Sequence, residues 1–206
     1  MPEITIRDAV PDTADVDAVA WDLETATDRM FSLLLGSRWE SVLRSVIAQP
    51  GHAWSVERAR VAEINGTLAG VLLGAPASVA EPDLTREVGH GWTRLRLAGV
   101  GLACQPFLSF MSRHHPDEWY ITAVSVKPEA RGQGVAAALL RDAIARARSA
   151  GMSSITLDMD TKNATAHRLY LREGFTVTGT SPPALLVGAV RVHRMQRPLR
   201  ADPAGG

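Results

Sequence analysis

The sequence predicts a mixed α/β fold in a single domain. Its length of 206 residues suits one domain of ordinary size. Strand-like runs alternate with amphipathic helical runs over most of the chain, which is typical of mixed α/β proteins. Two apolar runs are joined by Asn65-Gly66, a pair that tolerates positive φ and therefore favours a tight hairpin. Together these patterns predict a central sheet covered by helices.

The first half of the chain carries strand and helix signals in turn. The expected elements are a strand at 3–7, a helix capped by Asp12 or Thr13, an amphipathic helix at 39–47 and strands at 56–64 and 68–73. Residues 76–118 are expected to be a helical cover rather than a second domain. Two helical pieces are expected within it, at 88–102 and 107–113, separated by Gln105-Pro106 because proline blocks a helix interior.

The second half has the clearer pattern, and its helices end at glycines. The expected elements are a strand at 119–126, a loop at 127–134, a helix at 135–150, a strand at 154–159, a helix at 163–173 that Asn163 caps, and strands at 175–180 and 186–195. We expect a single domain over 1–200 and a flexible tail at 201–206.

Composition excludes several classes of protein. The 22 basic and 22 acidic residues balance, which argues against a nucleic-acid binder with a broad basic surface. One cysteine, Cys104, excludes a disulfide framework and a cysteine-rich zinc site, and we expect no metal. No apolar run approaches the length of a membrane span. Residues 1–28 hold eight acids and one base, Arg7, unlike a signal peptide. A cytoplasmic protein without membrane or nucleic-acid partners is expected.

The central feature is a glycine loop between a strand and a helix, Arg131-Gly132-Gln133-Gly134-Val135-Ala136. Glycines let the main chain approach a ligand, and the first N–H groups of the helix can bind a diphosphate without a metal. Two other interpretations stay open. One is a tight turn without a ligand. The other is a dinucleotide-binding loop of the form G-x-G-x-x-A followed by Asp158, although its glycines then begin too far beyond the strand.

Two stretches of sequence resemble the signatures of the Gcn5-related N-acetyltransferase (GNAT) superfamily. Val124–Ala136 is similar to its strand, proline-containing turn and acyl-CoA loop, with Ala136 where a second glycine is usual. Asn163-Ala164 followed by Leu169–Phe175 is similar to its second signature. The two lie in the right order about thirty residues apart. The resemblance implies a mostly antiparallel sheet with a split between two central strands, flanked by helices.

The resemblance also implies where acetyl-CoA, the acyl donor, binds. The main chain at Val124 and Val126 would pair with the pantetheine amides, and the glycine loop would bind the pyrophosphate. Tyr170 would face the sulfur. The positions carried over for coenzyme binding are Val124, Ser125, Val126, Arg131, Gly132, Gln133, Gly134, Val135, Ala136 and Asn163.

The expected chemistry needs an acid and a base. Tyr170 can return a proton to the departing sulfur, although its helical spacing also suits a core residue. Glu118 is the base expected from the resemblance to histone-type members. His114, His115 or a water chain are alternatives. Glu118 can also be interpreted as a solvated acid at the start of a strand, without a role in catalysis. Strand alternation places Glu118, Tyr120, Thr122, Val124 and Val126 on one side. Other side chains weighed for the acceptor site are Asp158, Asp160, His167, Trp21, Trp92 and Trp119.

The sequence therefore predicts an N-acetyltransferase that moves acetyl from acetyl-CoA to a primary amine by direct attack. The alternative is a catalytically silent acyl-CoA-binding module on the same fold, and a nicotinamide-dependent oxidoreductase ranks third. The acceptor amine cannot be read from the sequence. The oligomeric state also stays open, with a homodimer as one alternative because members of the family often pair.

Overall fold

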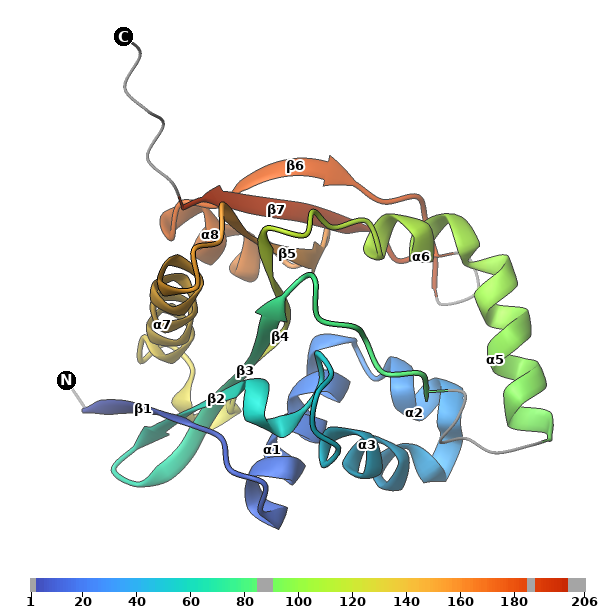
Figure 1. Ribbon diagram of the computed structural model, residues 1–206, viewed down its shortest axis with the longest axis horizontal. Helices are drawn as coiled ribbons and strands as arrows, with labels where there is room; N and C mark the ends of the chain where they lie inside the picture. The colour runs from blue at the N-terminus through green and yellow to red at the C-terminus, as the bar shows by residue number, and fades with distance from the viewer. Residues whose placement is uncertain (1–2, 85–90, 185–187, 200–206) are drawn as a thin grey trace, which may run out of the picture.

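The computed structural model describes residues 3–84, 91–184 and 188–199, which build one seven-stranded sheet (Figure 1). The strand order is β1-β2-β3-β4-β5-β7-β6, and every pair is antiparallel except β4 with β5. The strands are β1 (Ile4–Asp8), β2 (Ala59–Ile64), β3 (Thr67–Pro76), β4 (Glu118–Val126), β5 (Ser154–Asp160), β6 (Thr176–Thr180) and β7 (Val192–Pro198). This mixed, mostly antiparallel sheet confirms the predicted fold class and excludes a doubly wound dinucleotide fold.

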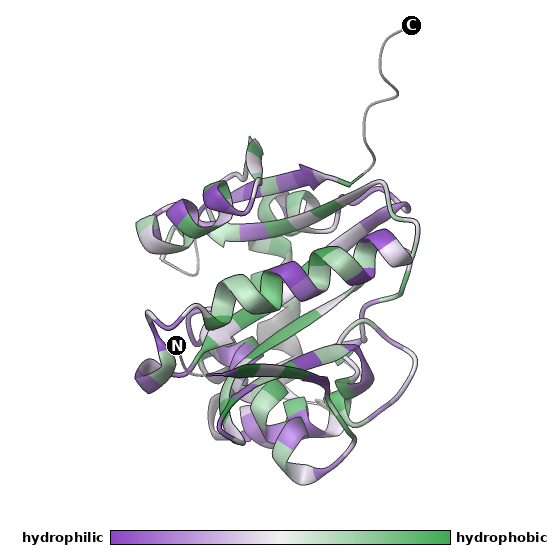
Figure 2. Cartoon of the chain, turned by 90° about the vertical axis from the view of Figure 1, so that its left-hand side faces the viewer, coloured by the Kyte–Doolittle hydropathy of each residue, from purple (hydrophilic) through white to green (hydrophobic). Residues whose placement is uncertain are grey.

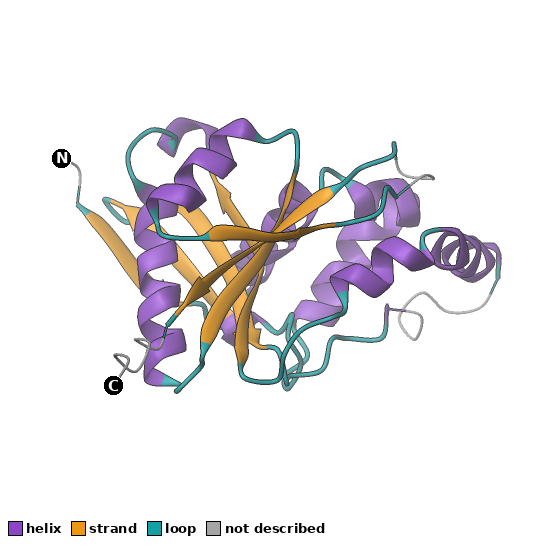
Figure 3. Cartoon of the chain, turned by 90° about the horizontal axis from the view of Figure 1, so that it is seen from above, coloured by secondary structure: helices purple, strands orange, loops and turns teal. Residues whose placement is uncertain are grey.

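Helices cover both faces of the twisted sheet (Figure 3). The helices are α1 (Thr13–Ala26), α2 (Met30–Leu35), α3 (Trp39–Ile47), α5 (Trp92–Ala103), α6 (Gln105–Met111), α7 (Val135–Ser149) and α8 (Ala164–Arg172). Side chains of α1 to α3 form a core cluster with one face, and those of α7 and α8 form a second cluster with the other. In Figure 2 α7 lies in front of the sheet with hydrophobic and hydrophilic segments along it, and its buried residues follow the apolar spacing that predicts one inward face.

The sheet is split between β4 and β5. The two strands pair in parallel over only four residue pairs, from Glu118↔Ser154 to Ile121↔Leu157. Beyond Ile121, β4 continues to Val126 along β3, and β5 continues to Asp160 along β7, without pairing to each other. The split therefore leaves one edge of the second half of β4 open inside the sheet, as the resemblance implied.

A β-bulge at Thr122 changes which way the residues of β4 face. Leu73 pairs with Ala123 and Gly74 with Ile121, so Thr122 is the additional residue on β4. Ile121 therefore packs in the α7 cluster, whereas Ala123 packs in the α1 cluster. The predicted shared face of Glu118 through Val126 is wrong for this reason. Glu118 and Tyr120 lie on one face, and Val124 and Val126 pack on the other.

Local chemistry explains the turns and caps that the sequence predicted. Asn65 and Gly66 have φ of 51° and 75° and connect β2 to β3. Asp12 caps α1 by accepting from the Asp15 N–H at 2.8 Å, and Asn163 caps α8 by accepting from the Ala166 N–H at 3.0 Å. Gly151 and Gly174 follow α7 and α8 with positive φ. These predictions are confirmed.

Several boundaries differ from the predictions. Residues 56–58 form a short 3-10 helix, so β2 begins at Ala59, and β7 begins at Val192 instead of 186. Pro106 does not lie between the two helices of the cover but in the first turn of α6, where its missing N–H needs no partner. The helix α2 was not predicted. The expected tail at 201–206, and 85–90 within the expected cover, lie outside the described residues.

The cover segment spans one side of the sheet. α5 packs near α2 at one end, and α6 lies beside β7 at the other (Figure 1). Among the described helices, none has the length and apolarity to cross a membrane.

Candidate functional site

The glycine loop is open and leads into the start of α7. Gly132 and Gly134 have φ of 76° and 89°, a region that favours glycine, and no atom lies within 4 Å of where their Cβ atoms would be. Gly134 is the N-cap of α7, so no N-cap side chain accepts from the first N–H groups of the helix. Arg131 is exposed beside them. The loop thus has the conformation, space and dipole of an anion site.

The edge of β4 that borders the split carries the main-chain groups of Val124 and Val126. The N–H of Lys127 bonds to the carbonyl of Ala69 on β3 at 2.9 Å. Because N–H groups alternate sides along a strand, the N–H of Val126 and that of Val124 point away from β3, toward the split. Ser125 is different. Its carbonyl faces β3, 2.8 Å from where a Cβ on Gly70 would be, and its hydroxyl faces α1.

α8 carries Tyr170 into the core cluster against which Val124 and Val126 of the unpaired half of β4 also pack. The Tyr170 ring is 7% exposed and packs edge-on against Phe175, with ring centroids 5.9 Å apart. Burial, with a further contribution from the negative charge of Asp22, raises the pKa of Tyr170 to about 12. The phenol is therefore protonated throughout the neutral range and can donate its proton.

Glu118 lies at the other, paired end of β4. Its Oε1 accepts from Gln196 Nε2 at 2.7 Å and its Oε2 from the His115 N–H at 3.2 Å. Four residues separate it from Thr122, where the split opens, a distance of about 13 Å along a strand. The structure does not bring Glu118 and Tyr170 into contact.

Asp158 is held in a buried network rather than exposed to a ligand. Arg194 of β7 binds both of its carboxylate oxygens at 3.1 and 2.8 Å, and Tyr120 donates to it at 3.1 Å. Arg194 also donates to the carbonyls of Met111 and Arg113, and its guanidinium lies 4.7 Å from the Phe110 ring centroid. Arg194 therefore fastens the end of α6 to β5 and β7.

His114 lies beside this network. Its ring packs against that of Tyr120 with centroids 4.1 Å apart and an angle of 43° between the ring planes, and its two nitrogens are buried with no hydrogen-bond partner among the described residues. Burial, followed by the positive charge of Arg194, lowers the pKa of His114. It is therefore neutral at pH 7 and able to accept a proton. His115, by contrast, is exposed and contacts Asp117 at 2.6 Å.

The remaining residues considered for the acceptor site have other surroundings. Asp160 accepts from the Lys162 N–H in a turn, and Asn163 is used as a helix cap. The ring of His167 lies 6.1 Å from that of His193. Trp119 is buried in the α7 cluster. The Nζ of Lys127 lies over the Trp21 ring, 3.8 Å from the ring centroid. The side chain of Trp92 is outside the described portion of the structure.

Sequence reasoning missed Asp22, a fully buried carboxyl on α1. In the sequence it is one of many acids in an acidic segment. A usable signal was present, because Asp22 is three residues after Val19 and one before Leu23, on the apolar stripe of the helix.

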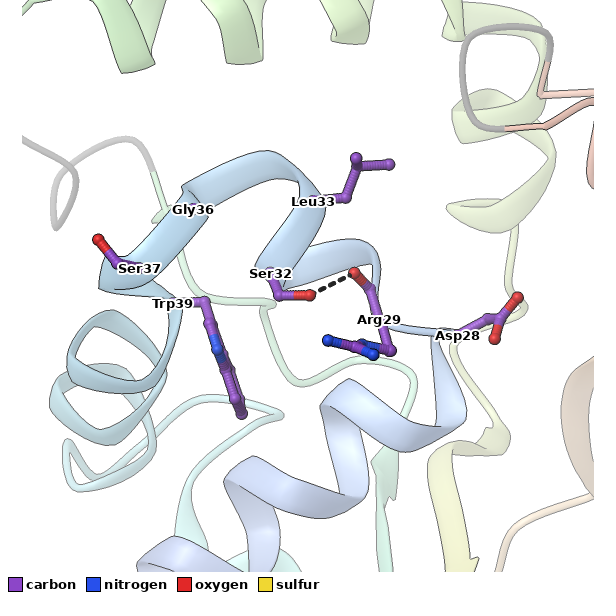
Figure 4. Close-up of a pocket in the computed structure, with 7 residues that line it drawn as sticks. All are labelled: Asp28, Arg29, Ser32, Leu33, Gly36, Ser37 and Trp39. Carbon is purple, nitrogen blue, oxygen red and sulfur yellow. Dashed lines mark hydrogen bonds between the residues drawn. The ribbon is translucent and has the colours of Figure 1, made fainter.

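A hollow of about 500 Å³ lies where α1 turns into α2 (Figure 4). Its lining residues are Asp28, Arg29, Ser32, Leu33, Gly36, Ser37 and Trp39. Asp28 and Arg29 both have positive φ, at 50° and 63°, which is unusual for residues with side chains. The side chains of Arg29 and Trp39 border the same space. This hollow is separate from the split, since no residue of β4 or β5 lines it.

Comparisons with known proteins agree with this geometry. The sequence profile of the acetyltransferase (GNAT) family matches residues 28–175. A segment of 73 residues is 36% identical to N-acetyltransferase 8B of Rattus norvegicus, covering 35% of this chain and 33% of the rat protein. The chain thus matches about a third of the length of that relative. Because the family profile spans most of the chain, the protein belongs to the acetyltransferase (GNAT) family.

Solved structures of similar fold cover nearly the whole chain. An N-acetyltransferase from Staphylococcus aureus Mu50 superposes with a TM-score of 0.66 at 18% identity, over 93% of this chain and 99% of that one. A GCN5-related N-acetyltransferase from Kribbella flavida gives 0.58 at 24% identity, over 95% and 98%. The ribosomal-protein-S18-alanine N-acetyltransferase of Escherichia coli gives 0.58 at 18%, over 99% of both chains. At these identities the likeness establishes the fold.

Proposed function

We propose that the protein transfers an acetyl group from acetyl-CoA to a primary amine by direct attack of the amine on the thioester. One observation carries the proposal. The open edge of β4 runs directly into the glycine loop at the start of α7, so strand-type main-chain groups lead to a helix N-terminus. An arm that contains amides and ends in a diphosphate matches this order of groups.

Each part of the open edge of β4 and of the glycine loop has a defined task in this proposal. The main-chain groups of Val124 and Val126 bind the amides of the arm as a neighbouring strand would. The N–H groups that follow Gly134 bind the diphosphate, and Arg131 adds a positive charge. The bulge at Thr122 turns the main chain where the pairing with β5 ends, which is where the thioester would lie. N–H groups there can stabilise the oxyanion.

Tyr170 is the proposed general acid. When the carbon–sulfur bond breaks, the departing sulfur needs a proton, and the buried phenol can give one. Its raised pKa makes it a weak acid in isolation, but burial also raises the pKa of a thiol in the same site. Direct attack needs no nucleophilic side chain, so Cys104, buried between α5 and α6, needs no catalytic role.

The acceptor is proposed to enter from the face that α1, α2 and α6 cover. The diphosphate site at α7 occupies the opposite face of the sheet, so the two substrates would meet at the split from different sides. The face that α1, α2 and α6 cover carries Glu118, His114 and the hollow beside α2. Its chemistry suits an amine, while the identity of the amine is a matter for the assay below.

Two measurements test the proposal. Calorimetric titration should show saturable binding of acetyl-CoA, and NADH should not compete. A panel of small amines and peptides is then screened with acetyl-CoA and a free-thiol readout. Thiol release that depends on one class of amine supports transfer. Binding without thiol release for any amine would identify a silent acyl-CoA-binding module, and no binding at millimolar acetyl-CoA would end the proposal.

A further inference from the structure

Asp22 is a fully buried carboxyl group on α1. The residue is 0% exposed, and neither Oδ1 nor Oδ2 has a partner among the residues that the structure describes. Buried polar atoms in folded proteins nearly always have a partner, and an unpaired carboxyl is costly to keep. A group kept in such a place calls for an explanation in terms of function, because packing alone favours an apolar residue there.

Asp22 lies against the unpaired half of β4. Ser125, in the unpaired half of β4, donates its hydroxyl to the main-chain oxygen of Asp22 at 3.3 Å. The charge of Asp22 also helps to raise the pKa of Tyr170, which belongs to the core cluster on the other face of the sheet. The carboxyl thus lies in the α1 layer against the split, within electrostatic reach of the proposed acid.

Other charged groups around α1 are engaged elsewhere or lie at a distance. β3 and α2 contain no titratable side chain. On α3, Arg44 pairs with Asp17 at 2.6 Å, and Lys127 at the end of β4 lies over Trp21. The other titratable residues on elements that pack on α1 are Glu40 of α3, Glu57 and Arg58 of η2 (Val56–Arg58), and Glu118 and Tyr120 of β4. Of these described groups, none donates a hydrogen bond to the Asp22 carboxyl.

We infer that Asp22 is the general base of the reaction, accepting the proton of the acceptor amine directly or through one water. The inference rests on the proposed acetyl transfer. As the bond between nitrogen and the thioester carbon forms, the amine N–H proton passes to the Asp22 carboxylate. As the carbon–sulfur bond breaks, sulfur takes the proton of the Tyr170 hydroxyl. Transfer of the proton from Asp22 to the Tyr170 phenolate then restores both groups.

The surroundings of Asp22 suit this role better than those of Glu118. Both oxygens of Glu118 already accept hydrogen bonds, and it lies at the paired end of β4. Burial raises the pKa of Asp22 well above its usual range, and the nearby Ser125 hydroxyl offsets only some of that rise. The carboxylate is thereby brought toward the proton affinity that a base needs near neutral pH. Asp22, on the α1 side of the sheet, and Tyr170, in the core cluster on the other side, then form an acid–base pair.

The test compares Asp22→Asn with Asp17→Asn, a matched change on the exposed side of the same helix. The asparagine of Asp22→Asn keeps the shape of the side chain and cannot take a proton. We expect kcat/KM for the best amine to fall roughly 10²–10⁴-fold in Asp22→Asn. We expect the decline of kcat/KM toward acid pH, caused by protonation of the base, to disappear as well. Asp17→Asn should keep both the native rate and the native pH profile.

The result that overturns the inference is equally specific. If Asp22→Asn folds, binds acetyl-CoA with native Kd and turns over within threefold of the native chain with the acid limb intact, Asp22 is not the base. Loss of the acid limb in Glu118→Gln or His114→Gln, with Asp22→Asn native-like, would assign the base to that residue instead.

Failure of this inference differs from failure of the proposed function. If native protein binds acetyl-CoA and releases thiol with an amine, the transfer stands whatever Asp22→Asn does. If native protein shows no transfer with any amine, the proposed function has failed before the variant is measured. Calorimetric Kd for acetyl-CoA, measured on native and Asp22→Asn protein, separates lost chemistry from lost folding.

Discussion

The two tyrosines of the chain occupy different electrostatic settings. The Tyr120 hydroxyl donates to Asp158, whereas Tyr170 lies in the core cluster of α7 and α8, where the charge of Asp22 helps to raise its pKa. If Tyr170 gives its proton to sulfur, Tyr170→Phe should lower kcat by roughly 10²–10⁴-fold because the acid is lost. The ring packing against Phe175 is retained, so Tm and the Kd for acetyl-CoA should change little.

Tyr120→Phe is the matched control for loss of a buried phenol hydroxyl. It removes one hydrogen bond to a carboxylate and should lower the free energy of unfolding by about 1–3 kcal/mol, while kcat stays within a few-fold. Steady-state kinetics and thermal unfolding of both variants check the pair. Equal losses of kcat in the two variants would contradict the acid role.

The carboxyl of Asp22 makes stability depend on pH. Because burial raises its pKa in the folded state, the folded chain keeps this proton over a range where the unfolded chain, with a pKa near ~3.9, releases it. The contribution of Asp22 to the free energy of unfolding is complete below the unfolded pKa. It is lost as pH rises through the folded pKa, by up to about 1.4 kcal/mol per pH unit.

Asp22→Asn removes this titration. We expect its Tm to rise relative to that of the native chain as pH increases from about 4 toward neutral. Thermal unfolding of both proteins at a series of pH values measures the difference. A Tm difference independent of pH would show that Asp22 keeps an ordinary pKa.

At the scale of elements, the start of α7 is expected to need Gly134. Its φ of 89° strains any residue with a Cβ by about 1–2 kcal/mol, and the Cβ would lie in the open space of the proposed diphosphate site. Gly134→Ala should therefore lower Tm and raise the Kd for acetyl-CoA at least tenfold.

Gly151 supplies the control at the opposite end of the same helix. Its φ is 73° and its surroundings are also open, so Gly151→Ala should cost similar stability and leave Kd unchanged. Calorimetry and thermal unfolding check both changes. An unchanged Kd in Gly134→Ala would remove the loop from the binding site.

The connection of α6 to the sheet is expected to depend on Arg194. Its partner Asp158 has a side chain that is 2% exposed, so Arg194→Met leaves a buried carboxylate without its ion pair. The expected loss is about 3–5 kcal/mol. The double variant Arg194→Met with Asp158→Asn should be more stable than the sum of the two losses predicts, which denaturant unfolding can measure. Strict additivity would argue against direct coupling.

Local signals predicted most elements, while tertiary contacts decided the details that the sequence did not reveal. Asn65-Gly66, Asp12, Asn163 and the glycines after helices act over a few residues, so they were readable. The bulge at Thr122 is imposed by the register between β3 and β4, and alternation along β4 alone could not show it. The helix α2 is only six residues long and has no side-chain cap, so its signal is weak.

The distinction between local signals and tertiary contacts also applies to the candidate functional site. The proposed coenzyme site could be assembled from the sequence because its residues are nearly contiguous, from Val124 to Ala136. The acid–base partners were harder to predict, because Asp22, Glu118 and Tyr170 come from three segments that only the fold brings to one sheet. The two hydrogen bonds that Glu118 accepts could not be predicted from the sequence either.

Binding of the coenzyme should stabilise the entire chain, because its site joins both halves of the sheet. A ligand at 100 times its Kd adds about 2.7 kcal/mol to the free energy of unfolding. For a chain of this size that corresponds to a rise in Tm of roughly 5–10 °C. Thermal unfolding with acetyl-CoA should show this shift, and NADH at equal concentration should show none. A shift with both would indicate nonspecific binding.

The short pairing of β4 with β5 has a consequence for what can enter the sheet. An outer edge strand with unpaired amides invites any extended chain to add to it. Here the unpaired amides of β4 lie inside the sheet between two helical layers, so an added strand would have to fit its side chains under both layers. An arm that carries amides but no side chains needs no such space, so we expect the split to favour a pantetheine-like chain over an extended polypeptide.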